Sequence, residues 1–265
     1  SECLVGSEMC IRDRYEDVYP VLYLKYRLSQ QAERSNIKHL VIDEMQDYSR
    51  LQYLIIRRMF SCKMTILGDR AQTMADQQQD VLQFLPGIFG KDLRRIEMRK
   101  SYRNTVEIAS YAANLIGVTD LELFERHGMP VLERDVTDLE AALREAVDTL
   151  FPEEKTYETT AVIVPDEKTA ERAYLILREI LAEKDFDCEK RLSWLNRDSS
   201  SFKKGLTVTT FYLAKGLEFD QVFSIFPKDE KREIMMQAQY IAATRALHEL
   251  RAVSYTHLPS PRDTR

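Results

Sequence analysis

The segment His39–Asp47 reads HLVIDEMQD, four mostly apolar residues that run directly into two adjacent carboxylates. A short apolar run of this kind is typical of a buried strand in a parallel sheet. In open α/β sheets, ligands bind beyond the carboxyl ends of the strands, which is where Asp43 and Glu44 would lie. One carboxylate there suits Mg²⁺, which takes oxygen ligands, and a second could activate a water molecule. The alternative interpretation is a strand that ends in two solvated acids.

A second apolar run, KMTIL at residues 63–67, is followed by GDRAQ at residues 68–72. Between the two runs, SRLQ at residues 49–52 has the pattern of a capping box and predicts the start of a helix. Strand, helix and strand together predict a right-handed βαβ unit with adjacent parallel strands. We therefore expect Asp69 and Gln72 to lie beside the acids that follow the first strand.

Strands and helices alternate along the rest of the chain, which predicts an α/β protein with parallel sheets. Turn residues near 86–90 predict a boundary between two α/β units, and residues 191–204 are expected to form a loop. Asn104 is the expected cap of the helix that follows it. The expected helices are residues 15–32, 49–60, 76–85, 104–116, 138–150, 166–184 and 233–250, and the expected strands are 39–42, 63–67, 159–164, 206–211 and 221–226.

The composition is that of an ordinary globular protein, with 44% hydrophobic and 31% charged residues among 265. The net charge of −5 lacks the overall basic character of many nucleic-acid binders. The four cysteines form no CxxC pair, which favours a reducing, cytoplasmic setting over a disulfide framework or a zinc site. No apolar run is long enough to span a membrane, so we expect no membrane partner.

The two ends of the chain, residues 1–14 and 254–265, lack helix or strand periodicity. We interpret both as non-native tails, similar to translated adapter sequence, and the alternative is ordinary frayed termini. The native segment would then run from Tyr15 to Val253.

Five short motifs, in order, resemble those of superfamily 1 helicases of the UvrD/Rep/PcrA kind. The resemblance implies two RecA-like (P-loop NTPase) domains. Residues 15–90 would be the C-terminal part of the first, which is incomplete at its N-terminus, and residues 91–253 would be the second. The matching segments are DEMQD at 43–47 (motif II), GDRAQ at 68–72 (motif III), SYRNT at 101–105 (motif IV), KGLEFD at 215–220 (motif V) and YIAATRA at 240–246 (motif VI).

In the first domain, the resemblance implies an ATP site that uses Mg²⁺. Asp43 would hold the metal and Glu44 would activate the hydrolytic water. Gln72 would sense the γ-phosphate and couple it to DNA.

In the second domain, the resemblance implies contacts to the nucleotide and two arginine fingers. Tyr102 would stack on adenine, and Arg103 and Arg245 would stabilise the transferred phosphate. Such fingers can contribute about 10³ to 10⁵ in rate. Gly216 and Glu218 would contact the phosphates and the sugar.

The chain departs from the family pattern in three ways. It contains no GxxxxGK[ST] phosphate loop, which we expect upstream of Tyr15. The family usually follows the glutamine of motif III with a base-stacking aromatic, whereas residues 73–75 here read TMA. The chain between residues 184 and 206 is too short for a large duplex-contacting insertion. With Tyr48 after the DEMQD motif, this shortness makes the chain similar to the helicase IV/HelD-like branch.

Three functions remain open from the sequence. The first is the ATPase core of a monomeric translocase on single-stranded DNA, and the second is an ATPase that remodels RNA polymerase. The third is a nucleotide-binding scaffold without catalysis. Basic residues that could follow a DNA strand are Arg94, Arg95, Arg99, Lys100, Lys203 and Lys204, and each could equally be an ordinary solvated charge.

Because this chain lacks the backbone N–H groups and the lysine of a phosphate loop, we predict that it hydrolyses ATP negligibly by itself. A phosphate-release assay with and without single-stranded DNA measures this. Turnover comparable with that of an intact superfamily 1 helicase would contradict the prediction.

Overall fold

The computed structural model describes residues 15–28, 36–69, 72, 80–90, 93–98, 100–119, 122–150, 157–184, 187–197, 199, 204–228 and 233–256. The chain divides into two compact units, Ser1–Glu97 and Met98–Arg265. The sequence placed a boundary between residues 90 and 91. Residues 1–14, the first expected tail, lie outside the described residues.

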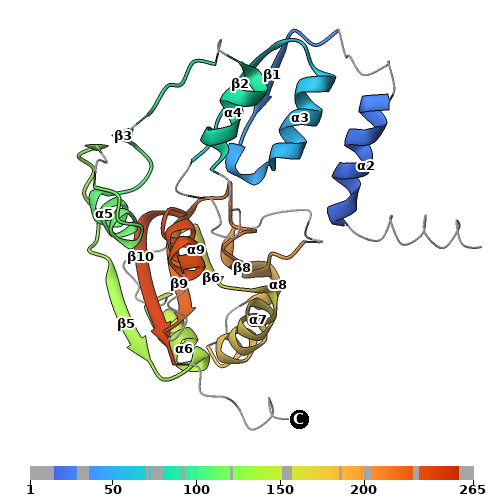
Figure 1. The fold of residues 1–265 in the computed structure, drawn as a ribbon. Coiled ribbons are helices and arrows are strands. Elements are labelled where there is room, and N and C mark those ends of the chain that lie inside the picture. Colours follow the sequence, from blue (N-terminus) through green and yellow to red (C-terminus); the bar gives the residue numbers. More distant parts are fainter. Residues whose placement is uncertain are drawn as a thin grey trace, which may run out of the picture. The chain divides into compact units, whose positions relative to one another are not determined.

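The first unit contains a βαβ arrangement (Figure 1). Strands β1 (His39–Ile42) and β2 (Lys63–Ile66) pair in parallel, with Ile42 opposite Ile66. Helix α3 (Arg50–Met59) connects them and begins with the expected capping box. In this box the Ser49 backbone N–H donates to Gln52 Oε1 at 2.6 Å. The expected adjacent parallel strands are therefore confirmed.

The other elements of this unit are helix α2 (Tyr15–Leu28), the 3₁₀ helix η1 (Met45–Asp47) and helix α4 (Val81–Phe89). Its small core consists of Ile42, Tyr53, Val81 and Leu85. Tyr53 lies at the centre of this core.

Helix α4 differs from the expected helix at residues 76–85, of which 76–79 lie outside the described residues. Asp80 caps the helix, which continues through Pro86 to Phe89. We expected Pro86 to end it, because proline lacks the N–H that bonds to the preceding turn. The apolar residues beyond the proline explain the difference, since the ring of Phe89 lies 6.2 Å from that of Tyr53 in the core.

The second unit is built on a six-stranded sheet in which every pairing is parallel, with the order β5-β10-β9-β6-β8-β7. Its strands are β5 (Leu132–Val136), β6 (Thr159–Val164), β7 (Leu192–Trp194), β8 (Gly205–Thr210), β9 (Phe219–Pro227) and β10 (Ala246–Tyr255). A separate parallel pair is formed by β3 (Lys100–Ser101) and β4 (Glu122–Leu123). The predicted α/β fold with parallel sheets is confirmed.

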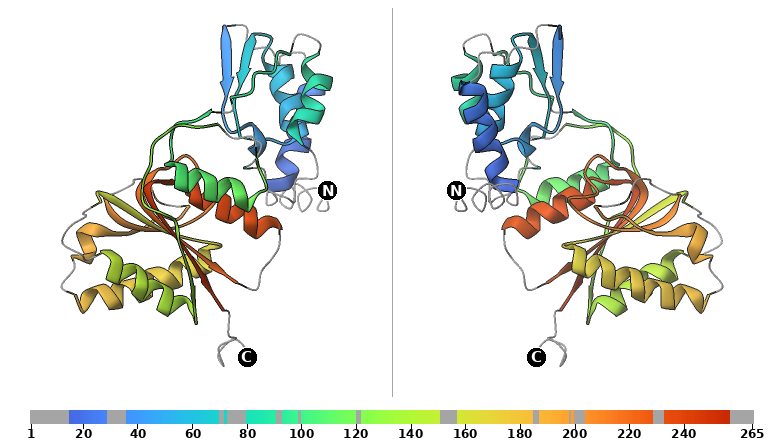
Figure 2. Two further views of the ribbon diagram at one scale, coloured as in Figure 1. Left: turned by 90° about the vertical axis from the view of Figure 1, so that its left-hand side faces the viewer. Right: turned by 90° about the vertical axis from the view of Figure 1, so that its right-hand side faces the viewer.

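Helices cover both faces of the six-stranded sheet (Figures 1 and 2). Helices α6 (Leu139–Leu150) and α7 (Glu167–Ala182) pack together on one face, and α5 (Val106–Leu115) and α9 (Glu233–Ala243) pack together on the other. The short helix α8 (Cys188–Arg191) precedes β7.

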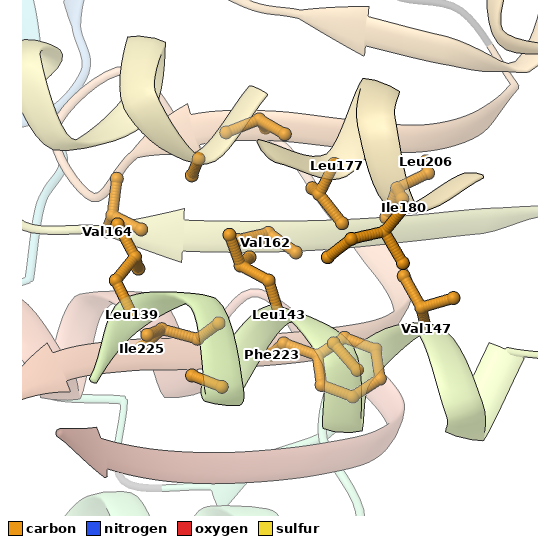
Figure 3. Close-up of a cluster of buried hydrophobic side chains, with 14 of the residues drawn as sticks. Leu139, Leu143, Val147, Val162, Val164, Leu177, Ile180, Leu206, Phe223 and Ile225 are labelled. Carbon is orange, nitrogen blue, oxygen red and sulfur yellow. The ribbon is translucent and has the colours of Figure 1, made fainter. Parts of the chain in front are cut away.

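Figure 3 shows the main core, which lies between the sheet and the pair α6 and α7. Leu143 of α6, Val162 of β6 and Phe223 of β9 are fully buried there. Coverage on both faces explains why β6 and β9 are nearly continuous apolar runs rather than alternating ones.

The end of the second unit corrects two expectations. The helix expected at residues 233–250 ends at Ala243, and β10 follows it. This strand includes residues 254 and 255, which we had assigned to a tail, while residues 257–265 lie outside the described part of the chain. The error has a physical cause. Ala246, Leu250 and Val253 are buried at a spacing that imitates a helix period, because β10 is an inner strand with buried residues on both faces and only His248 exposed.

Four short strands are absent from the prediction. β5 and β7 lie at the edges of the six-stranded sheet, where pairing on one side is enough and the sequence signal is weak, and β3 and β4 are two residues each. β7 lies within residues 191–204, which we had expected to be a loop.

No helix in the described ranges combines the length and the apolar character needed to cross a bilayer.

Two leucines of α7 test the position of the core. Leu177 is fully buried and Leu175 is 52% exposed. Leu177→Ala should lower the free energy of unfolding by about 2–5 kcal/mol, since it leaves a cavity. The matched control Leu175→Ala should change it by less than about 0.5 kcal/mol. Urea denaturation measures both, and equal losses would contradict the packing of α7.

Candidate functional site

The two acids after β1 occupy a specialised turn. Glu44 has φ 51° and ψ 53°, and it is the only non-glycine among the described residues with a positive φ. Such left-handed backbone is unusual for a residue with a long side chain and is found often at functional sites. The Glu44 N–H donates to Asp43 Oδ1 at 2.9 Å, so the first acid stabilises the turn that presents the second.

The buried amide of Gln46 joins the loop after β1 to the loop after β2. Its Nε2 donates to the Glu44 carboxylate, and its Oε1 accepts from the Asp69 N–H at 3.1 Å. The backbone adds a second link, in which the Met45 N–H donates to Leu67 O at 2.8 Å. The acids expected to gather at one sheet edge are therefore held together by hydrogen bonds.

Gln72 extends this junction. Its side chain is 7% exposed, and its Nε2 donates to Asp69 Oδ2 at 3.0 Å. Its Oε1 is buried and has no hydrogen-bond partner among the described residues. Residues 70, 71 and 73–75, which include the expected site of the missing aromatic, lie outside the described residues.

Gly68 allows the two loops to approach each other. A Cβ at this position would lie 2.6 Å from Gln46 Oε1 and 2.7 Å from the Met45 backbone nitrogen. Only glycine fits this contact without movement of the loop that carries Glu44.

The carboxylate of Asp43 is exposed and fits an Mg²⁺ ion that is held mainly by phosphates and water. The described ranges contain no group of three or more acids, histidines or cysteines that could hold a metal alone. The orphaned Oε1 of Gln72 is a further oxygen acceptor near this turn, suited to a water or a hydrated ion.

In the second unit, motif IV contacts motif V through an ion pair. Arg103 Nε lies 2.7 Å from Glu218 Oε1, and both side chains are about half exposed, at 47% and 43%. Gly216 lies two residues before Glu218, with φ 78° and open space around the position of a Cβ. Arg103 and Glu218 therefore meet at an accessible surface.

Asn104 connects motif IV to motif VI, a role that the sequence did not reveal. Its buried Nδ2 donates to Thr244 O at 3.2 Å and to Ala246 O at 2.6 Å. The expected helix cap at Asn104 is wrong, because the hydroxyl of Thr105 accepts from the Ile108 N–H at 3.4 Å and caps α5. Both residue types cap helices well, so the sequence alone could not separate them.

Arg245 is 2% exposed. Its guanidinium donates to Ile241 O at 3.3 Å and to Leu217 O at 3.5 Å. Its own carbonyl accepts from the Phe219 N–H at 2.9 Å. The side chain thus binds carbonyl groups of its own unit, and contact with a phosphate would require it to leave them.

Tyr102 is 62% exposed, and its ring lies 5.6 Å from that of Phe124. The predicted residues therefore form two sets. Asp43, Glu44 and Gln72 lie in the first unit. Tyr102, Arg103, Gly216, Glu218 and Arg245 lie in the second, where Arg103 pairs with Glu218 and Arg245 donates to the carbonyl of Leu217.

Of the basic residues considered for a DNA path, Arg95 pairs with Glu97, and Lys204 pairs with Glu158 at 2.6 Å. Arg99 and Lys203 lie outside the described residues. The described basic residues therefore do not define a path by themselves.

Residues 17–74 match the family model described as the UvrD/REP helicase N-terminal domain. The match includes Asp43, Glu44 and Gln72, and the motifs of the second unit lie beyond it. A search of curated proteins returned no match.

Three solved structures are similar to parts of this chain. The C-terminal domain of a possible DNA helicase from Lactobacillus plantarum is 26% identical, with a TM-score of 0.44, over 62% of this chain and 93% of that one. Dbp5 of Saccharomyces cerevisiae, bound to Gle1 and IP6, is 17% identical with a TM-score of 0.46, over 90% and 56%. An arterivirus nonstructural protein 10 (helicase) with DNA is 13% identical with a TM-score of 0.40, over 86% and 41%. At these TM-scores, the likenesses assign no function to this chain.

Gly68→Ala should disrupt the junction between the two loops, because its Cβ would collide with Gln46 and Met45. We expect a loss of about 1–3 kcal/mol in the free energy of unfolding. The control is Gly87→Ala, where a Cβ meets nothing within 4 Å and the helix α4 should be equally or more stable. Urea denaturation tests both, and an unchanged Gly68→Ala variant would refute the close approach.

Proposed function

We propose that this chain carries part of the ATPase core of a superfamily 1 helicase, in which ATP hydrolysis drives movement on single-stranded DNA. The observation that carries the proposal is the hydrogen-bonded junction of Glu44, Gln46, Asp69 and Gln72. It lies within the residues that match the UvrD/REP helicase N-terminal domain.

The junction suits a general base for water attack. Gln46 donates to only one oxygen of Glu44, which leaves the other oxygen to accept a proton from a water molecule. The hydrogen bond also fixes the direction of the carboxylate, and positioning matters most in phosphoryl transfer. Asp43 would hold Mg²⁺, which would neutralise charge on the phosphates.

The same junction offers a route for coupling. Gln72 is joined to Asp69, and Asp69 is joined through Gln46 to Glu44. A movement of the Gln72 side chain when the γ-phosphate leaves would therefore be transmitted to the carboxylate of Glu44 through three hydrogen bonds. This is the part of the proposal in which hydrolysis is linked to movement.

The second unit would supply positive charge and a base-stacking ring. Arg103 is the more available arginine finger, because half of its side chain is exposed while Arg245 is buried. Tyr102 would stack on adenine, and Gly216 with Glu218 would contact the phosphates and the sugar. To contact a phosphate, Arg103 would have to break its ion pair with Glu218.

An ATPase that remodels RNA polymerase is the second candidate. One observation favours it: the chain between α7, which ends at Ala182, and β8, which begins at Gly205, holds only α8 and β7 among its described residues. That connection leaves little room for a duplex-contacting insertion. Single-strand binding that weakens steeply with salt would support the DNA motor. Co-purification with polymerase, without such binding, would support the remodeller.

We predict that Glu44→Gln abolishes ATP turnover in a longer protein that joins this chain to a phosphate loop, with a loss of about 10²-fold or more. ATP binding should persist, because the amide keeps the size of the side chain and its hydrogen-bonding capacity. The matched control is Glu189→Gln on the exposed face of α8, which should leave turnover unchanged. Phosphate release and nucleotide binding measure the two effects, and unchanged turnover in Glu44→Gln would remove Glu44 from its assigned role.

A further inference from the structure

The second unit exposes two aromatic rings side by side. Tyr102 is 62% exposed and Phe124 is 46% exposed, and their ring centroids are 5.6 Å apart at 38°. Adjacent aromatic rings of this size are usually buried, because each removes a large apolar area from water. A pair left in solvent indicates a binding surface.

The pairing of β3 with β4 puts these rings together. Ser101 lies opposite Leu123 in the parallel register, so the next residues of the two strands, Tyr102 and Phe124, are neighbours. The Phe124 N–H donates to Ser101 O at 3.2 Å, which continues the pairing by one step. Residues 22 positions apart in the chain are thereby fixed as one pair.

A cation completes the group. Lys100 lies two residues before Tyr102, and side chains two apart in a strand share a face. Its Nζ is 5.5 Å from the Tyr102 centroid and 5.9 Å from the Phe124 centroid. The register partner of Lys100 is Glu122. Two rings with an adjacent cation complement a planar base that carries a phosphate.

The β3–β4 pairing holds the chain before Phe124, and hydrogen bonds anchor the loop after it. Arg126 donates to Leu247 O, and the Val106 N–H donates to Arg126 O at 2.9 Å. Further along, the carboxylate of Glu107 accepts from His127 Nδ1 at 2.9 Å and from the Gly128 N–H at 2.9 Å. The bond from His127 lowers the pKa of Glu107 to about 2, so the carboxylate remains an acceptor down to acidic pH. Phe124 is therefore presented by a fixed loop.

We propose that Phe124 is the second ring of a base-stacking site with Tyr102, and that Lys100 is its phosphate-facing cation. The occupant is the base of a free mononucleotide, since the cation at the rings, Lys100, matches one base with its own phosphate. The inference rests on the proposed function for Tyr102 and extends the site to Phe124 and Lys100.

The test is an NMR titration of the 265-residue chain with AMP. Ribose 5-phosphate, which keeps the phosphate and lacks the base, is the matched ligand control. We expect AMP to shift the ring signals of Tyr102 and Phe124, and ribose 5-phosphate to leave them in place. Phe124→Leu should weaken AMP binding by about 5-fold or more, the effect of losing part of a base–aromatic stack.

Two further variants separate stacking from folding. Phe124→Tyr retains a ring and should restore AMP binding to within about 2-fold of the original chain. Lys100→Gln should weaken AMP binding and flatten its salt dependence. The control Tyr23→Leu removes the ring that Arg27 approaches at 5.8 Å in α2, and it should leave AMP binding unchanged.

The outcomes distinguish this inference from the proposed function. Weaker AMP binding in Phe124→Leu, with binding restored in Phe124→Tyr, supports the two-ring site. If Tyr102→Leu weakens AMP binding and Phe124→Leu does not, the role of Phe124 is overturned and Tyr102 is a single stacking ring. Ring shifts with oligothymidylate and none with AMP would overturn the mononucleotide as the occupant. None of these results depends on the turnover of Glu44→Gln.

Discussion

The side chain of Gln46 is the constraint on which the first unit depends. Its buried amide nitrogen donates to the Glu44 carboxylate and its oxygen accepts from the Asp69 N–H, so one side chain links the two loops. Because an unsatisfied buried amide is costly, the two loops are stable only when they are together. The left-handed turn at Glu44 and the close approach at Gly68 both occur in these two loops, and both are compatible with the bonds of Gln46.

In the second unit, too, hydrogen bonds hold separate segments together. Their donors come from different segments, and their acceptors all lie in one turn. The four consecutive carbonyls of residues 244–247 are bound by Asn104, the Phe219 N–H, Asn104 again and Arg126. These donors all come from segments more than 20 residues earlier in the sequence. Motifs IV, V and VI are thus joined through backbone atoms, and the exposed pair of Arg103 and Glu218 lies at the margin of this rigid frame.

Much of the architecture could be predicted from the sequence, because local signals and tertiary structure agree in its strongest elements. The capping box at Ser49 and the apolar runs of β1, β2, β6 and β9 are examples. The errors arose where tertiary packing decides the outcome. β10 has buried residues on both faces and so imitates a helix, and α4 passes through Pro86 because its last turn packs on Tyr53. In the site, residue types indicated Asp43 and Glu44, whereas Asn104 and Phe124 become functional candidates only through register and long-range contacts.

The left-handed backbone of Glu44 has a consequence for how this chain would change under selection. A residue with a β-carbon in this conformation costs about 1–2 kcal/mol relative to glycine. Glycine at this position would relieve that strain, but it would also leave the buried Nε2 of Gln46 without its carboxylate acceptor. The two effects oppose each other, so selection for thermal resistance alone would have little reason to replace Glu44, and the strained turn and the acid would be retained together.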